Sequence, residues 1–262
     1  ILLRLLDSPS RFNKIRKLKS KQHKVIKAHK KTNQGLLYLL EEDWAASEKM
    51  LIDGRKDNNL TAINYIAAAY AAQQLNSKVK RENYLRLAYQ QNPDLELAIG
   101  IAQAKFQAKD NDYQSCLTTL KQLQRIDPRH KAILRLLKAT YIELEDWNSL
   151  LLLIVPLKKR KVLSEIEAFK LQIQAYSHLL IITADDAKQH HIDELWQSIP
   201  KKLRREPELI IPYINFLVSQ NHDEDALKLL LHSIKRHWDD RYLPLYAKIN
   251  ALLCGKFIDS VF

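Results

Sequence analysis

Apolar residues recur along most of the chain every three to four positions, which is the spacing of an amphipathic helix. Tyr113, Cys116 and Leu120 follow this spacing in the middle of the sequence. Short polar breaks interrupt the pattern and predict helices separated by turns. The predicted turns lie near residues 7–10, 41–43, 56–60, 76–78, 92–94, 109–112, 127–130, 144–146, 160–164, 184–191, 205–207, 220–223 and 238–240.

An acidic residue followed by an aromatic residue recurs as Asp43-Trp44, Asp112-Tyr113 and Asp146-Trp147. The aromatic residues are 69 and 34 positions apart, and Pro93 and Pro128 are 35 positions apart. Two apolar helical patterns fall within each period. The chain therefore contains repeats of about 34 residues, each built from two helices.

The residues at these positions resemble the tetratricopeptide repeat (TPR). Its unit places small residues where two helices approach closely, an aromatic residue at the start of the second helix and a proline at the end. One hairpin of this kind cannot bury its own apolar face, so neighbouring hairpins stack. The predicted fold is an all-α, TPR-like α–α superhelix, a solenoid of antiparallel helix pairs.

The fit to the repeat period varies along the chain, and this variation predicts five segments. Residues 161–205 fit worst and are predicted as a helix over 164–182, a loop and an irregular helix over 191–199. The segments are a basic arm (1–31), TPR-like repeats (32–160), an irregular helical insert (161–205), a further repeat (206–250) and an atypical tail (251–262).

Composition agrees with an all-α protein. The chain has 4 Gly and 8 Pro in 262 residues. A β-rich protein needs turn residues about every 8–12 positions, and a doubly wound α/β fold needs glycine-rich loops. Both classes are therefore excluded.

Positive charge is concentrated at the start of the chain. Residues 1–31 hold eleven Lys or Arg and one acid, a net charge of +10, which leaves +2 of the total +12 for residues 32–262. Such an arm is typical of a segment beside an anionic membrane surface. The residues predicted to contact the membrane are Arg11, Lys14, Arg16, Lys17, Lys19, Lys21 and Lys24.

The chain starts with the apolar run Ile1–Leu6, and two interpretations of that run stay open. It is the end of a membrane helix whose main part precedes residue 1, or the start of an ordinary amphipathic helix. No stretch of 18 apolar residues occurs, so we expect no bilayer-spanning helix in this sequence.

First-helix positions line the concave wall of a TPR array and predict a protein-binding groove. Asn64 offers two hydrogen bonds to a peptide backbone, and Arg135 offers a clamp for a carboxylate. In the alternative interpretation, Asn64 satisfies a neighbouring turn and Arg135 pairs with an acid such as Glu143. The predicted groove residues are Thr61, Asn64, Ala68, Arg135 and Ala139.

Motifs of catalysis are missing from the sequence, which contains no P-loop, nucleophile elbow or Cys-x-x-Cys. We expect no enzyme activity, no catalytic residues and no metal site. His190 and His191 are adjacent, so on a helix they point about 100° apart. Candidate axial ligands for a haem iron are nevertheless present at Tyr65, His130, His178, His190 and His191.

Several motifs match one family in their order and spacing over about residues 1–245. They are Asn64–Tyr65, Arg81, Tyr84–Ala88, Asp127–His130, Leu134–Leu137, Tyr141, Asp146–Trp147, Leu150–Leu151, Lys161–Leu163, Leu195–Trp196 and Lys235–Arg241. In these motifs the chain resembles the HemY family, proteobacterial inner-membrane TPR proteins associated with late protohaem synthesis. A flavoenzyme that shares the HemY name needs a Gly-x-Gly-x-x-Gly turn, and the four isolated glycines here exclude it.

The resemblance implies two membrane helices before residue 1, repeats facing the cytoplasm and further TPR units beyond this chain. It also implies haem-biosynthesis enzymes as protein partners. The first functional hypothesis is therefore a membrane-tethered scaffold of late haem biosynthesis. The second is a carrier or regulator in the same pathway that binds haem or porphyrin. Nucleic acid is not expected as a partner, because Phe12 is the only aromatic residue in the arm.

Overall fold

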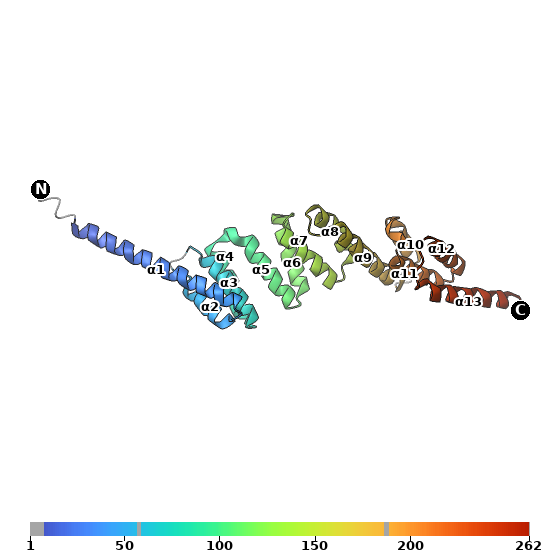
Figure 1. Cartoon of the computed structure of the whole chain (residues 1–262), viewed down its shortest axis with the longest axis horizontal. Coiled ribbons are helices and arrows are strands. Elements are labelled where there is room, and N and C mark those ends of the chain that lie inside the picture. The colour runs from blue at the N-terminus through green and yellow to red at the C-terminus, as the bar shows by residue number, and fades with distance from the viewer. Residues whose placement is uncertain (1–7, 57–58, 186–188, 262) are drawn as a thin grey trace. The chain divides into compact units, whose positions relative to one another are not determined.

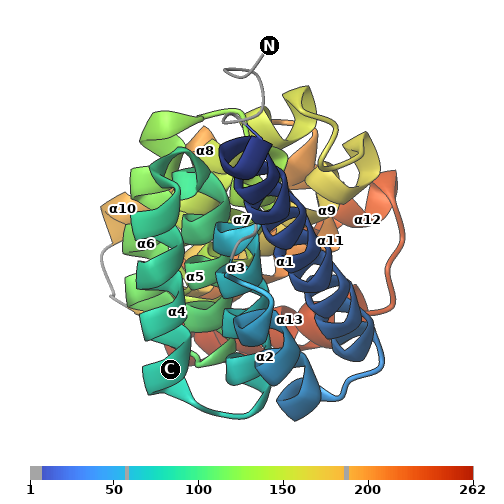
Figure 2. The same ribbon diagram turned by 90° about the vertical axis from the view of Figure 1, so that its left-hand side faces the viewer.

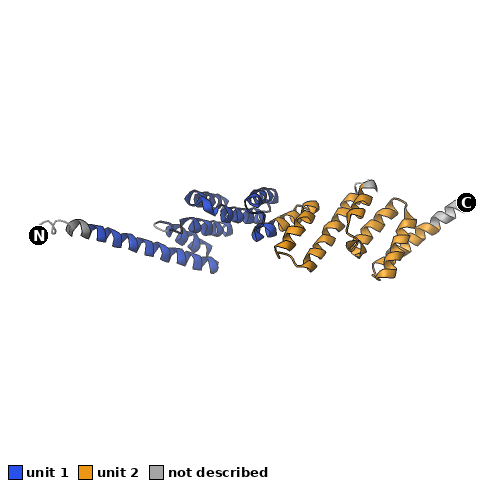
Figure 3. Cartoon of the chain, turned by 90° about the horizontal axis from the view of Figure 1, so that it is seen from above, with its two compact units in different colours: residues 1–136 blue, residues 137–262 orange. Residues whose placement is uncertain are grey.

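The computed structural model describes residues 8–56, 59–185 and 189–261, and in these ranges it contains helices and turns but no strand (Figure 1). The chain divides into two compact units, residues 1–136 and 137–262 (Figure 3). Helix α7 (Lys131–Glu143) contains the division.

The first unit is a series of helix pairs. Its α-helices are α1 (Ser8–Leu40), α2 (Trp44–Asp53), α3 (Thr61–Gln74), α4 (Lys78–Gln91), α5 (Glu96–Lys109) and α6 (Tyr113–Ile126), with a short 3-10 helix η2 (Pro93–Leu95) before α5. Helix α1 packs on α2, α2 on α3, α3 on α4 and α5 on α6 (Figures 1 and 2). Each pair thus covers the apolar face of the next, as the repeat pattern predicts.

The turns inside the pairs repeat one geometry. Glu42, Asn76, Asn111 and Glu145 adopt positive φ angles of 53° to 61°. The next residue in each turn donates its backbone N–H to a carbonyl five residues earlier, as Asp43 does to Tyr38 at 2.9 Å. This closes the helix with a left-handed residue in a Schellman motif. These residues are 34, 35 and 34 positions apart, so the backbone conformation recurs with the same period as the sequence pattern.

The acidic-aromatic pairs of the sequence are the starts of second helices. Asp43, Asp112 and Asp146 each accept a hydrogen bond from the backbone N–H three residues later, at 3.0–3.2 Å. This N-cap satisfies one of the N–H groups that a helix start leaves without a partner. The aromatic residue is the first of its helix. Caps and helix pairs together confirm the predicted all-α, TPR-like fold.

The residue five positions after each left-handed residue packs against the first helix of its pair. Ser47 donates to the carbonyl of Gly35 at 2.9 Å, and Cys116 donates to that of Ala104 at 3.2 Å. All four are buried. In the second pair Arg81 occupies this position and is 2 % exposed. A charged side chain therefore stands where the first and third pairs have the small residues Ser47 and Cys116.

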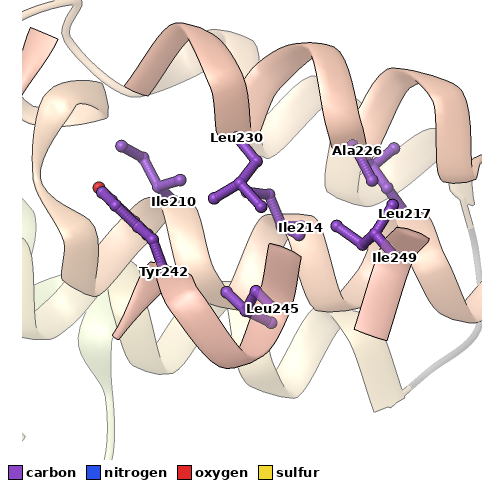
Figure 4. Packing of buried hydrophobic residues seen from close by; sticks show 8 residues of the cluster. All are labelled: Ile210, Ile214, Leu217, Ala226, Leu230, Tyr242, Leu245 and Ile249. Carbon is purple, nitrogen blue, oxygen red and sulfur yellow. The ribbon is translucent and has the colours of Figure 1, made fainter. Parts of the chain in front are cut away.

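The second unit contains α8 (Trp147–Lys159), α9 (Glu165–Asp185), α10 (Gln189–Ser198), η3 (Leu203–Arg205), α11 (Pro207–Ser219), α12 (Asp223–Arg236) and α13 (Tyr242–Val261). Helix α9 packs on α8, α10 and α11, and α12 packs on α11 and α13. Figure 4 shows the apolar cluster formed by the last three helices, among them Ile214, Leu230 and Tyr242. The helices predicted at 164–182 and 191–199 correspond to α9 and α10.

Two predicted segment boundaries fall inside helices. Helix α1 runs through the boundary at 31/32, because Ala28 and Thr32 are both buried. Helix α13 runs through the boundary at 250/251, although the side chains of 255–262 and residue 262 itself lie outside the described residues. The break at Ile199–Lys202, before η3, was not predicted.

The left-handed turn residues give a test of the repeat geometry. Glu145 has φ 53°, where a Cβ atom costs about 1 kcal/mol relative to glycine. We expect Glu145→Gly to unfold with about 1 kcal/mol more free energy than Glu145→Ala in urea denaturation. The alanine variant is the matched control, because both variants lose the same exposed carboxylate. A less stable glycine variant would contradict the turn geometry.

Candidate functional site

The first half of α1 extends beyond the rest of its unit (Figure 1). Every residue from Asn13 to Lys24 is exposed. Large apolar side chains are among them, since Ile15 and Leu18 are 52 % and 54 % exposed. Basic and apolar side chains therefore share one helix surface that no described part of the chain covers.

These apolar side chains lie on one face of α1. At about 100° per residue, Ile15, Leu18, Val25 and Ile26 fall within about a third of a turn. Ala28, Thr32 and Gly35 are buried in the first unit, and they lie on an adjoining face, with Thr32 about 20° from Val25. The apolar stripe therefore borders the buried face at Val25 and extends away from it toward Ile15 and Ile26. Its exposed part is flanked by lysines, as in helices that lie on membrane surfaces.

Six of the seven residues predicted to contact a membrane lie on this segment and are exposed: Lys14, Arg16, Lys17, Lys19, Lys21 and Lys24. The side chain of Arg11, the seventh, lies outside the described residues. In the ranges described, none of the helices combines the length and apolar character needed to cross a bilayer.

The predicted groove is wrong at two of its five residues. Asn64 and Ala68 are each 0 % exposed. The Nδ2 atom of Asn64 donates to Oγ1 of Thr32 at 2.9 Å, which joins α3 to α1. Thr61 is half-buried and donates to the carbonyl of Arg55 at 2.8 Å. These side chains hold helices together, because stacking of α1, α2 and α3 covers the face that the pattern assigned to a ligand.

Arg135 and Ala139 are exposed one turn apart on α7. Among the described residues, Arg135 makes no ion pair, so the proposed pairing with Glu143 does not form. A carboxylate clamp at Arg135 stays a prediction.

An apolar groove along α9 was missed by the sequence analysis. It has a volume of 530 Å³ and is lined by Ile166, Phe169 and Ile173, with Glu206 and Glu208 at its side. Ile166 is 70 % exposed. The spacing of these residues by three and four positions was available in the sequence. This spacing did not distinguish an exposed groove from the core, because α9 also carries buried residues, such as Ala175, on another face.

The candidate haem ligands do not converge. Tyr65 is buried and stacks on Tyr84, with ring centres 6.2 Å apart. His178 is exposed, lines the α9 groove and stacks on Trp147 at 4.2 Å. His191 is exposed, His130 is half-buried, and the side chain of His190 lies outside the described residues. Within the part of the chain described, no three His, Cys, Asp or Glu side chains are grouped as a metal ion would require.

The motif Lys235–Arg241 spans the end of α12 and the turn that leads to α13. Arg241 bonds Asp239 at 2.8 Å and Glu208, on α11, at 3.0 Å. Hydrogen bonds from Arg241 lower the pKa of Asp239 to about 2. The motif therefore has a structural role, because Arg241 ties this turn to α11.

Comparison with known proteins finds similarity to HemY proteins. The family described as "HemY protein N-terminus" matches residues 1–76. "Protein HemY" of Escherichia coli (strain K12) is 27% identical over 217 residues, which cover 83% of this chain and 54% of that protein. The chain is therefore similar to HemY proteins along most of its length. The HemY protein of Shigella flexneri matches with the same identity and coverage. The chain spans about half the length of the HemY proteins it matches.

Two solved structures are also similar to this chain. A tetratricopeptide repeat protein from Parabacteroides merdae matches with a TM-score of 0.47 and 11% identity, over 85% of this chain and 98% of that one. Pseudomonas aeruginosa pilF matches with a TM-score of 0.48 and 11% identity, over 88% of this chain and 99% of that one.

Proposed function

We infer that this chain is a HemY-family scaffold that binds the anionic inner-membrane surface through α1 and holds protein partners of late haem biosynthesis on its repeats. The observation that carries the proposal is the exposed first half of α1, where an apolar stripe lies between lysines. The HemY relationship supports the pathway. In this proposal the repeats face the cytoplasm, where basic segments beside a membrane are preferred.

Charge and apolar contact act together in this binding. Each Lys or Arg near an anionic leaflet contributes about 1 kcal/mol. Ile15 and Leu18 enter the boundary of the acyl chains, while the flanking lysines extend to the headgroups. Helix α1 is continuous from Ser8 to Leu40, so binding of its first half fixes the first repeat beside the membrane.

Holding partners requires accessible surface, and two regions supply it. Arg135 and Ala139 are exposed on α7, and the α9 groove is lined by the exposed Ile166 and the half-buried Phe169 between charged residues. An apolar centre with a polar rim is typical of protein interfaces. In this role the chain performs no chemistry and needs no cofactor.

A haem or porphyrin carrier is the second candidate. It is favoured by the position of His178, which lines the apolar α9 groove with Phe169 and Ile173. An imidazole in an apolar groove is a suitable ligand for haem iron. A change in the Soret band on addition of haem, abolished by His178→Ala, would favour the carrier over the scaffold.

Vesicle flotation tests the membrane role. We expect the chain to float with phosphatidylglycerol-containing vesicles and not with phosphatidylcholine vesicles at low salt. Binding to the anionic vesicles should fall as salt rises from 50 mM to 500 mM, because salt screens charges at the surface. Equal flotation with both lipids would remove the role assigned to the arm.

A further inference from the structure

The second unit contains a basic pocket of 590 Å³ between α10, the segment 199–206, the start of α11 and the end of α12. Four permanent cations line it, namely Lys201, Arg204, Arg205 and Arg236, and the carboxylate of Glu206 opposes them. This pocket is separate from the basic arm and was not predicted from the sequence.

The four cations of this pocket make no ion pair with any described residue, although Glu206 also lines the pocket. The Nε atom of Arg204 is buried and has no hydrogen-bond partner in the part of the chain described. A buried N–H without a partner is destabilising, so a ligand that accepts a hydrogen bond from this atom would be stabilised there. Arg241, by contrast, pairs with Glu208 and Asp239.

Apolar side chains form the rest of the wall. Trp196, Ile210 and Leu229 line the pocket, and Trp196 is held in place by stacking on Tyr213 with ring centres 4.3 Å apart. A volume of 590 Å³ lies within the range of small-molecule sites. Guanidinium groups bind carboxylates and phosphates in two-point geometry. The combination suits a ligand with several acidic groups on an apolar body.

We propose that this pocket binds a small organic polyanion, with its acidic groups on Arg204, Arg236 and their neighbours and its apolar body against Trp196. The acidic groups are carboxylates or phosphates, which share this recognition chemistry. The pocket takes no part in membrane binding by α1. An experiment can therefore contradict ligand binding here without contradicting the scaffold proposal, and the reverse also holds.

The probe is the fluorescent aromatic polyanion pyrene-1,3,6,8-tetrasulfonate, titrated into the intact chain at 150 mM salt without vesicles. We expect Arg204→Gln with Arg236→Gln to weaken binding at least about tenfold, because two charge-assisted contacts are lost. The exposed pair Lys201→Gln with Arg205→Gln should also weaken binding, and this variant keeps the test valid if the first does not fold. Competition by pyrophosphate and by citrate separates phosphate from carboxylate preference.

The Glu206→Gln substitution should strengthen binding of the probe, whereas the two pocket variants weaken it. It removes the one acidic side chain among the described residues that line the pocket, so the probe should bind several-fold more tightly, which a misfolded variant cannot reproduce. Lys159→Gln with Lys161→Gln is the matched control, because both residues are exposed in the same unit outside the pocket. The control should bind within twofold of the parent chain.

Three results would overturn the proposal. The first is unchanged binding in both pocket variants, which would place the probe on the arm or elsewhere. The second is equal binding of a neutral pyrene, which would show an apolar site only. The third is no saturable binding of the probe up to 1 mM.

Discussion

Replacing Lys14, Lys17, Lys21 and Lys24 by glutamine is expected to weaken binding to phosphatidylglycerol vesicles about a thousandfold. All four side chains are exposed on the first half of α1. At about 1 kcal/mol for each charge, their loss removes about 4 kcal/mol, and 1.4 kcal/mol corresponds to a factor of ten. Sedimentation of the chain with vesicles over a range of lipid concentrations measures the partition coefficient.

The matched control removes the same charge elsewhere. Lys49, Lys78, Lys105 and Lys121 are exposed on the repeats of the same unit, and their replacement by glutamine should reduce binding far less. An equal loss in both variants would show that net charge alone attracts the chain. The apolar stripe and the position of the arm would then have no specific role.

Replacing Arg81 by alanine is expected to lower the free energy of unfolding by about 3 kcal/mol. Removal of one member of a buried ion pair costs about 3–5 kcal/mol, and the value here lies at the low end because the partners are partly hydrated. Arg81 bonds Asp110 at 2.7 Å and Glu82 at 2.7 Å. Asp110 is 30% exposed and Glu82 is 45% exposed, whereas Arg81 is 3% exposed in its side chain.

The network around Arg81 joins two helix pairs. Arg81 also donates to Gln73, which in turn donates to Asp110 at 2.9 Å. Its guanidinium carbon lies 5.5 Å from the ring centre of Phe106. Since Asp110 stands at the end of α5 and Gln73 at the end of α3, the alanine variant should loosen the contact between these pairs.

The effect of Arg81→Ala should depend on pH. Burial raises the pKa of Asp110, but hydrogen bonds from Arg81 and Gln73 outweigh it, so the pKa is lowered from its ordinary value of 3.8. A lowered pKa stabilises the folded state above pH 3.8, and this stabilisation is lost as the pH falls through the folded value. The stability difference between parent and variant should therefore shrink below pH 3.8.

Urea denaturation of two further variants separates charge from packing. Arg86→Ala, on an exposed residue of α4, should change stability by less than about 0.5 kcal/mol. Arg81→Met keeps most of the side-chain volume, so a smaller loss than in Arg81→Ala would assign part of the effect to packing. A loss below 1 kcal/mol in Arg81→Ala would contradict the structural role of the network.

Sequence alone determined the features that depend on neighbouring residues. The aspartates 43, 112 and 146 mark helix starts because an N-cap bond spans three residues. The spacing of apolar residues located the helix pairs, and the charge count located the basic arm. Such signals are local, so they can be recognised without knowledge of what packs against each helix.

Tertiary structure decided which faces stay open and which polar groups are satisfied. Asn64 fitted a ligand groove by position, yet it is buried against Thr32 of α1. Arg81 occupies a small-residue position because Asp110, 29 residues away, compensates its charge. The basic pocket at Arg204 joins side chains from α10, the segment 199–206, α11 and α12. Burial and charge compensation depend on partners distant in sequence, and a periodic pattern carries no information about them.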